Sequence, residues 1–264
     1  MNTPFQAKAF FHLENEQWYI GNDPARGPWD ENACHAGPVT GVIARELEQL
    51  VPDKQLFRLT VEVLKPIPMR GFQIHSEFRK QGRMVSTATA TVIDRSGKTI
   101  AIASSLHAKT LKVGELPTAT ISKPDFDESI PGDFPIKDAK HNLPFFSAGI
   151  EIRYPPEENS HPGPTTIWMK TLPLLESELP SPFQRLCPLA DCGNGISRNQ
   201  EVSEANFLNP DLTIIMFRAP TSNWLASKAK SFWESSGLGM SDATLFDTDG
   251  PIGSALQTLL VHPV

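Results

Sequence analysis

Asp191 is the one carboxylate in the stretch CPLADCGNGISRN (187–199), where Gly193 and Gly195 follow it closely. A carboxylate among small and apolar residues can act as a general base that takes a proton from water. An Asp at a helix start can equally be an N-cap that stabilises the helix by roughly 1 kcal/mol. Both interpretations place Asp191 at the start of a helix, so the rest of the chain must decide between them.

The composition limits the functions that this carboxylate can serve. The 264 residues carry 30 Asp and Glu against 24 Lys and Arg, for a formal net charge of −6. Binding to DNA or RNA needs clustered basic side chains, so nucleic acid is excluded as a partner. No apolar run approaches the roughly 20 residues that span a bilayer, and the N-terminus lacks the regions of a signal peptide. We therefore expect a soluble, cytoplasmic protein without membrane contact.

The cysteines and the serine motifs argue against several other chemistries. Cys34, Cys187 and Cys192 are odd in number and have no C-x-x-C spacing, so neither a disulfide framework nor a zinc site is expected. The chain also lacks the G-x-S-x-G elbow of serine hydrolases. We expect neither a metal nor another cofactor.

An internal repeat is the clearest long-range feature of the sequence. A shift of 153 positions aligns LTVEVLK (59–65) with LTIIMFR (212–218) and ATVIDRSG (90–97) with ATLFDTDG (243–250). One offset that aligns several segments without a gap indicates a tandem duplication. The same shift pairs three further residues with identical ones: Cys34 with Cys187, Ile43 with Ile196, and Arg45 with Arg198.

Each copy has the periodicity of one helix followed by antiparallel strands, which predicts an α+β fold. In the first copy, apolar residues recur at steps of three and four from Val39 to Leu50, as in an amphipathic helix. Alternation then predicts a strand with Phe57, Leu59, Val61 and Val63 on one face. Hairpin turns are expected at 94–97 and 247–250. Further strands are predicted over 72–80, 84–93, 99–108, 211–218, 224–233, 241–247 and 252–261.

The same patterns divide the chain into three parts. Residues 1–110 form the first repeat and residues 145–264 the second. Residues 111–144 between them are rich in proline and acidic side chains and have no period, which is typical of a connecting arm.

Four segments of the sequence resemble those of the acyl-CoA thioesterases with tandem (double) hot-dog domains, a TesB-like family. These segments are RGPWDENACHAGPVTGVIARELE (26–48), LADCGNGISR (189–198), FLNPDLTIIMFR (207–218) and GSALQTLL (253–260). The first contains His35-Ala36-Gly37, with alanine in place of the first glycine of the family's His-Gly-Gly. The resemblance implies that each repeat is a long helix wrapped by an antiparallel sheet.

The resemblance also implies an activity and its residues. The family hydrolyses acyl-CoA to a free acid and CoA in fatty acid metabolism, without a cofactor. Its water-activating groups fall on Asp191, Asn209 and Gln257, and Asn209 stands where bacterial members usually have Thr. We expect Gln257 to orient a water between its amide and the carboxylate. Hot-dog relatives commonly associate further, so a homo-oligomer is possible.

Substrate-side residues are expected near the helix starts, where backbone N–H groups and the positive dipole end can meet a developing oxyanion. His35, Gly37 and Gly193 are the candidates, the glycines because they let a ligand approach the backbone closely. His35 can equally be a cap residue of the first helix.

The repeat itself favours the second copy as the catalytic one. Under the shift of 153, Asp191 corresponds to Pro38, Asn209 to Leu56, and Gln257 to Ser104 or Ser105. The framework therefore matches while these three polar positions differ, which indicates that one copy became specialised.

Two other functions remain as alternatives. Asp30 and His35 have the D-x-N-x-x-H spacing of hot-dog enoyl-CoA hydratases, although Ala33 replaces that motif's proline. The departures at Ala36 and Asn209 would also permit a protein that binds acyl thioesters without catalysis. Thiol release from saturated acyl-CoA distinguishes the thioesterase from both.

Overall fold

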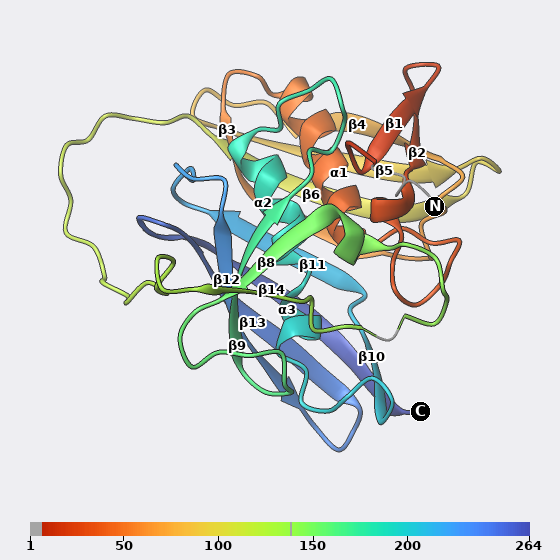
Figure 1. Ribbon diagram of the computed structural model, residues 1–264. Coiled ribbons are helices and arrows are strands. Elements are labelled where there is room, and N and C mark those ends of the chain that lie inside the picture. Colours follow the sequence, from red (N-terminus) through yellow and green to blue (C-terminus); the bar gives the residue numbers. More distant parts are fainter. Residues whose placement is uncertain (1–6, 138) are drawn as a thin grey trace.

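Two threonines mark the place where the two halves of the chain meet. The computed structural model describes residues 7–137 and 139–264 (Figure 1). Strand β3 (Gln55–Val63) pairs antiparallel with β11 (Asp211–Met216), and Thr60 lies opposite Thr213. Their hydroxyl oxygens are 3.0 Å apart, and the two residues are separated by the repeat distance of 153 positions. A pseudo-twofold axis therefore passes between them, which confirms the duplication predicted for the strands.

The strands of both halves join in one antiparallel sheet. On the N-terminal side its order runs from β1 through β2, β4, β5 and β6 to β3, and on the C-terminal side from β11 through β14, β13, β12, β9 and β8 to β7. All strands predicted from the sequence are present, whereas β1, β2 and β7 to β10 were not predicted. The bounds are β1 Phe11–Glu14, β2 Trp18–Gly21, β4 Phe72–Lys80, β5 Val85–Asp94, β6 Thr99–Ala108, β7 Ile130–Gly132, β8 Ile150–Tyr154, β9 Thr165–Thr171, β10 Ala205–Leu208, β12 Leu225–Trp233, β13 Leu238–Asp247 and β14 Gly250–Pro263.

The helices correct the prediction for the second repeat. Helix α1 (Ala36–Leu50) is as expected, but α2 (Pro182–Ala190) begins earlier, behind the N-cap Ser181, and α3 (Gly193–Ile196) follows it. Asp191 therefore lies at the C-terminal end of α2 and not at a helix start. No helix among the described residues is long and apolar enough to cross a membrane.

The start of the second helix was predicted wrongly because of the periodicity of helices. From Ala36 to Pro182 is 182 − 36 = 146 positions, seven fewer than the offset of the strands. Seven residues are about two helical turns, so a shift of seven keeps apolar residues on the same helix face. The offset of 153 therefore aligned Cys34, Ile43 and Arg45 with identical residues of the second repeat that are shifted by one heptad. These aligned residues do not occupy equivalent positions in the two repeats.

The second helix is interrupted between α2 and α3 by its own residues. Pro188 lies inside α2 and has no N–H to donate to the preceding turn. The Cys192 N–H bonds to the Leu189 carbonyl at 3.0 Å, a tighter turn than that of an α-helix. Gly193 and Gly195 are poor helix formers and weaken the continuation further. The interruption turns the chain at Asp191.

Helices α1 and α2 lie against each other in opposite directions (Figure 1). A Cβ on Gly37 would lie 2.9 Å from the Pro188 carbonyl oxygen and 3.0 Å from the Asp191 Cβ, so only glycine fits there. At the other end, Glu48 of α1 accepts hydrogen bonds from Ser181 Oγ and Gln184 Nε2. This packing brings the start of α1 beside the end of α2.

One residue of the predicted strand pattern faces the other way. The pairing of β3 with β6 shifts its register between Leu56 and Arg58. Phe57 is consequently 39% exposed while Leu56 is buried, so Phe57 does not share the buried face of Leu59 and Val61. A β-bulge of this kind adds a residue that strict alternation cannot foresee.

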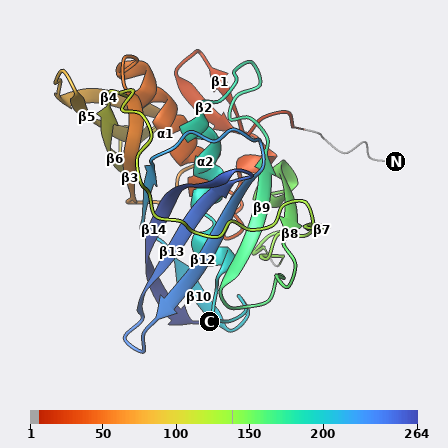
Figure 2. The same ribbon diagram turned by 90° about the vertical axis from the view of Figure 1, so that its left-hand side faces the viewer.

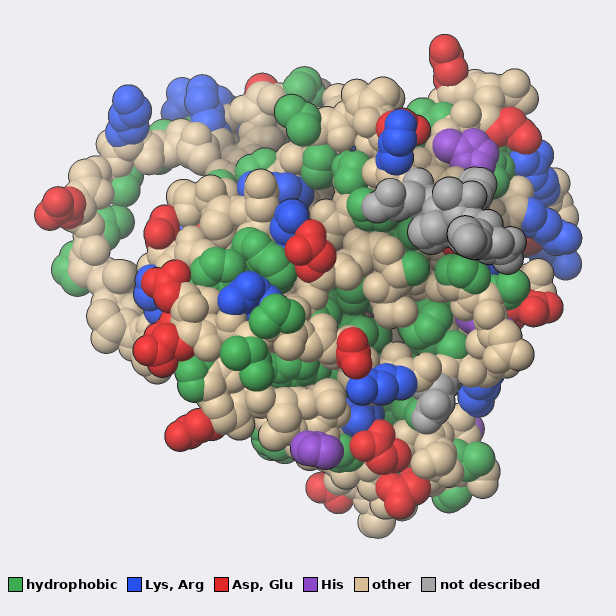
Figure 3. Space-filling view, in the orientation of Figure 1, with side chains coloured by type: hydrophobic (Ala, Val, Ile, Leu, Met, Phe, Trp, Pro, Cys, Tyr) green, Lys and Arg blue, Asp and Glu red, His purple; other side chains and the backbone are tan. Residues whose placement is uncertain are grey.

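The segment between the repeats has two structural parts. Residues 109–124 contain no helix or strand, cross the outer side of the C-terminal sheet (Figure 2) and loop out from the body of the molecule (Figure 3). Farther along, β7 pairs with β8, and Phe134 and Ile136 are buried. The expectation of a featureless arm is therefore wrong for residues 130–136, while the division at 110 and 145 stays a prediction.

His107 in β6 is a fully buried titratable group away from the helices. Its Nε2 lies 3.0 Å from Ser105 Oγ, and its Nδ1 has no partner among the described residues. Burial, together with the positive charge of Lys54, lowers the pKa of His107 to about 4, with Asp53 opposing weakly. The imidazole is therefore neutral in the fold at neutral pH.

The lowered pKa of His107 predicts a pH-dependent stability. The unfolded chain takes up this proton near pH 6.5 and the folded chain only near 4, so stability is lost as pH falls through this window. Between pH 7 and pH 4.5, we expect the free energy of unfolding to decrease less in His107→Leu than in the native chain. Urea denaturation at both pH values measures the difference, and equal losses in the two chains would contradict the buried neutral imidazole.

Candidate active site

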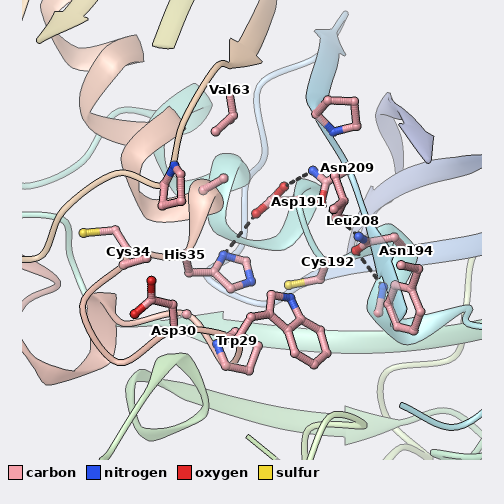
Figure 4. A pocket seen from close by; sticks show the side chains of 18 of the residues that line it. Trp29, Asp30, Cys34, His35, Val63, Asp191, Cys192, Asn194, Leu208 and Asn209 are labelled. Atoms are coloured by element: carbon pink, nitrogen blue, oxygen red, sulfur yellow. Dashed lines mark hydrogen bonds and ion pairs between the residues drawn. The ribbon is translucent and has the colours of Figure 1, made fainter. Parts of the chain in front are cut away.

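A cavity with a volume of about 380 Å³ opens between the start of α1 and the end of α2 (Figure 4). Both repeats and the segment between them contribute to its wall. Its polar lining includes His35, Asp191, Asn194 and Asn209. The apolar lining is larger and includes Trp29, Val63, Leu64, Phe134, Ile136, Phe207 and Leu208.

Asp191 is only 5% exposed, and three neighbouring side chains hold its carboxylate. Its Oδ1 accepts hydrogen bonds from Asn209 Nδ2 at 2.9 Å and Gln257 Nε2 at 3.2 Å. Its Oδ2 lies 3.1 Å from His35 Nδ1 (Figure 4). A carboxylate offers about four acceptor positions. Among the described residues three are filled, two on Oδ1 and one on Oδ2, and Asp191 lines the cavity.

His35 is both the N-cap of α1 and a neighbour of the carboxylate. Its Nδ1 lies 3.1 Å from the Gly37 nitrogen and 3.1 Å from Asp191 Oδ2, and one ring nitrogen cannot accept from the first and donate to the second. A lone pair aimed at a buried carboxylate would be repelled, so we assign the proton to Nδ1. The ring stacks on Phe146 with centroids 4.1 Å apart, which fixes its orientation. Nε2 is thereby left for the cavity.

Three amides form a network behind the carboxylate. Asn194 Nδ2 donates to Asn209 Oδ1 at 2.9 Å, and the Asn194 N–H donates to Gln257 Oε1 at 2.9 Å. Because both amide oxygens are occupied by donors, the amide nitrogens of Asn209 and Gln257 must face Asp191. Gln257 also donates to the Asp191 carbonyl at 2.9 Å.

The three residues expected to activate water thus lie together, but Gln257 has a different place from the one expected. It is 3% exposed and bonds directly to Asp191, without lining the cavity. The 3.2 Å bond from Gln257 Nε2 to Asp191 Oδ1 is direct, so Gln257 holds the carboxylate itself in this arrangement. That Gln257 orients a water stays a prediction.

The two glycines expected at the substrate serve packing within the protein. A Cβ on Gly193 would lie 2.8 Å from Ser241 Oγ and 2.9 Å from Gln257 Oε1, so its close neighbours are side chains of β13 and β14. Gly37 faces α2, and neither glycine lines the cavity. Gly195 does line it.

The start of α1 meets the cavity. His35 and Ala36 line the cavity, and the first turn of a helix has N–H groups without intrahelical acceptors. Pro38 removes one of these donors and suits the first turn. The positive end of the α1 dipole therefore faces the cavity.

Two thiols line the cavity without the properties of a nucleophile. Burial raises the pKa of the Cys34 thiol, although Arg26 opposes this weakly. Burial and then the charge of Asp191 raise the pKa of the Cys192 thiol. Both stay protonated at neutral pH, so neither supplies a thiolate. Within residues 7–137 and 139–264 no group of three or more His, Cys, Asp or Glu is arranged to hold a metal.

The two residues of the hydratase motif, Asp30 and His35, do not contact each other through a hydrogen bond or an ion pair in the described part of the chain. Asp30 is exposed and its Oδ1 accepts a hydrogen bond from the Asn32 N–H at 2.8 Å, as in an Asx-turn. His35 faces Asp191.

Sequence reasoning missed several residues of this site, among them one amide and three apolar side chains. Asn194 lies in the segment LADCGNGISR (189–198), but the residues that it contacts come from distant parts of the chain. Phe146 follows the supposed arm and carries no periodic signal. Phe134 and Ile136 lie in the arm itself, where two isolated apolar residues among prolines and acids predict no packing.

The fold and the site define a double hot-dog protein with a carboxylate at the cavity wall, and the comparisons agree. A family model described as the acyl-CoA thioesterase N-terminal domain matches residues 25–108. The corresponding C-terminal domain matches residues 124–261. The chain belongs to this acyl-CoA thioesterase family, which is a family of thioester hydrolases. No curated protein matches it in sequence.

Solved structures show the same fold over nearly the whole chain. A protein described as a thioesterase from Novosphingobium aromaticivorans is 17% identical with a TM-score of 0.73, covering 96% of this chain and 99% of that one. A hot-dog protein from Alicyclobacillus acidocaldarius is 14% identical, with a TM-score of 0.72 and 97% of each chain covered. The tesB protein of Mycobacterium avium subspecies paratuberculosis is 13% identical, with a TM-score of 0.69 and 96% of each covered.

The close packing at Gly193 predicts a contrast between two neighbouring glycines. Gly193→Ala places a methyl group against Ser241 and Gln257, and such overpacking costs about 1–3 kcal/mol. A Cβ at Gly195 would meet Ile136 at an ordinary 3.5 Å, so Gly195→Ala serves as the matched control. We expect urea denaturation to show a loss of stability for the first variant alone. Equal stabilities would contradict the packing of α3 on β13 and β14.

Proposed function

We propose that this chain hydrolyses acyl-CoA to a free acid and CoA through a water molecule activated by Asp191. The observation that carries the proposal is a buried carboxylate that lines the cavity and whose Oδ2 keeps one acceptor position that no donor among the described residues fills. The carboxylate is buried and fixed, as a general base must be to work with one geometry. The family of thioester hydrolases supplies the reaction class.

The reaction follows from this arrangement in two steps. The water gives a proton to Asp191 while its oxygen bonds to the thioester carbonyl carbon. The tetrahedral oxyanion that forms is stabilised by the N–H groups and the dipole at the start of α1. The carbon–sulfur bond then breaks, and the CoA sulfur leaves with the proton that Asp191 had taken. Asp191 returns to its ionised form.

The polar neighbours of Asp191 have separate roles in this scheme. Asn209 and Gln257 fix Oδ1, so the carboxylate cannot rotate and Oδ2 stays toward the cavity. His35 donates to Oδ2 and presents Nε2 to the substrate side. Positioning of this kind contributes to rate because reacting atoms are held near their attack geometry.

The apolar part of the cavity fits the acyl chain. Trp29 and Phe207 pack edge to face, 6.0 Å between centroids, and form one wall. Phe134 and Ile136 from the segment between the repeats form another. Apolar walls exclude bulk water from the thioester, which strengthens every electrostatic interaction in the site.

The general-base role predicts the effect of a nearly isosteric change. Asp191→Asn keeps the size of the side chain but removes the base, so thiol release from saturated acyl-CoA should fall by about 10² or more. Asp30→Asn is the control, since Asp30 lines the same cavity without touching the carboxylate. A free-thiol assay with both folded variants decides the matter. Unchanged release in Asp191→Asn removes Asp191 from the mechanism. Consumption of enoyl-CoA without thiol release, abolished by Asp30→Asn, would instead support the hydratase motif.

The hydrogen bond from Asn209 predicts a loss that a hydroxyl can restore. Asn209→Ala removes a bond to a charged acceptor worth about 1.5–3 kcal/mol, equivalent to roughly a 10- to 100-fold fall in kcat. Asn209→Thr offers a hydroxyl donor at the same place and should recover most of the activity. The comparison of kcat and KM for the two variants is the measurement. Equal kcat in Asn209→Ala and the native chain would show that Asn209 does not position the base.

A further inference from the structure

A second cavity, with a volume of about 410 Å³, lies between α2, the end of β9 and the start of β12. It shares no lining residue with the cavity at Asp191. Sites for small molecules have volumes of about 300–1,000 Å³ and combine an apolar wall with a few polar groups. The size of the second cavity is in this range, and the proposed hydrolysis uses none of its residues.

Most of the wall of this cavity is apolar. Its buried part includes Met169, Leu174, Leu189 and Leu225. Leu179 also lines the cavity but is 98% exposed, so it makes almost no packing contact within the chain. Burial of exposed aliphatic surface is favourable in proportion to its area. The wall therefore favours a ligand with an aliphatic part that covers Leu179.

Arg185 of α2 brings a positive charge to the same cavity. Its guanidinium donates to the Pro220 carbonyl at 3.3 Å, the Ser222 carbonyl at 3.2 Å and Asn223 Oδ1 at 2.8 Å. These three bonds fix the position of the guanidinium, and all three acceptors are uncharged. An arginine side chain has five N–H donors, so the acceptors of the described chain leave two of them for a ligand.

No carboxylate of the described residues lines this cavity or pairs with Arg185. Arg218, another partly exposed arginine of the second repeat, pairs with Asp247 at 2.6 Å. Lys170 lines the cavity too, but its Nζ lies 2.7 Å from Glu151 Oε1. Burial lowers the pKa of Arg185, although a guanidinium stays charged at neutral pH. The charge of Arg185 is thus partly desolvated without a counter-ion.

The first repeat shows that the fold requires neither this arginine nor an open face beside it. At the helix offset of 146, Arg185 corresponds to Val39, since 185 − 146 = 39, and Leu189 corresponds to Ile43. Val39 is 1% and Ile43 0% exposed, so protein covers this face of α1 completely. The same face of α2 borders a cavity and carries a charge.

We propose that the second cavity binds an aliphatic carboxylate, a free fatty acid, with its carboxylate on Arg185 and its chain along the apolar wall. The free N–H groups of Arg185 donate to the carboxylate, because the planar guanidinium matches that group. A neutral lipid would leave the charge unpaired, and an anion without a chain would leave Leu179 uncovered. The proposal concerns binding alone and does not depend on the proposed function, although a free acid is also the product of that reaction.

Titration calorimetry with octanoate tests the role of the charge on the full chain. We expect Arg185→Gln to raise the octanoate Kd by about 10-fold or more, since a charged hydrogen-bonded pair is lost. Arg83→Gln is the matched control, because it removes the same charge from an exposed position outside the cavity. Equal titrations for the native chain and Arg185→Gln, as for octanoate bound only at Asp191, overturn the proposal. A native chain that binds no octanoate overturns it as well.

A second variant tests the apolar wall without disturbing the fold. Leu179→Ser changes a fully exposed side chain, so thermal melting should be unaffected, while the octanoate Kd should rise by about three- to tenfold. Each CH₂ group that the wall covers should lower the Kd by roughly fourfold, so octanoate should bind more tightly than hexanoate. Octanol has the same chain without the charge and should bind at least about 10-fold more weakly than octanoate. Octanol that binds as tightly as octanoate, or an unchanged Kd in Leu179→Ser, contradicts a fatty acid as the ligand.

Discussion

The contact between Gly37 and the end of α2 is the constraint on which the site depends. The start of α1 lies so close to the end of α2 that a Cβ on Gly37 would be 2.9 Å from the Pro188 carbonyl oxygen and 3.0 Å from the Asp191 Cβ. This approach brings the helix N-terminus and its cap residue His35 to the buried carboxylate of Asp191. A larger residue would push the two helices apart and separate Asp191, the proposed base, from the N–H groups at the start of α1.

The interruption of the second helix makes the two equivalent junctions between the helices different. Helix α1 continues through the positions where α2 ends and α3 begins. At the helix offset of 146, Asp191 corresponds to Arg45, which forms a two-bond ion pair with Glu178 at 2.6 Å for each bond. Asn194 corresponds to Glu48, which is occupied by Ser181 and Gln184. The first junction thus holds paired and hydrogen-bonded charges, while the helix interruption in the second leaves Asp191 and Asn194 at the wall of the cavity.

The strands and the members of the site could be predicted because their signals are local. Alternation and the offset of 153 predicted β3 to β6 and β11 to β14. Short segments that resemble the family's motifs indicated Asp191, Asn209 and Gln257. The start of the second helix was misplaced because a heptad shift preserves its apolar face. The direct bond from Gln257 to Asp191 and the cavity wall at Phe134 and Ile136 could not be predicted, since they depend on how distant segments meet.

Strand β14 connects the inner side of the C-terminal sheet, where Asp191 lies, with the outer side. Because side chains alternate along a strand, Gln257 points inward to Asp191 while Leu256 and Thr258 point outward. A one-residue slip of β14 would exchange these faces, removing the amide from the carboxylate and burying the outer residues. Its long pairing with β13, and with β11 beside the pseudo-twofold axis, resists such a slip. The orientation of the Asp191 carboxylate therefore depends on the register of the sheet as well as on the packing of the helices.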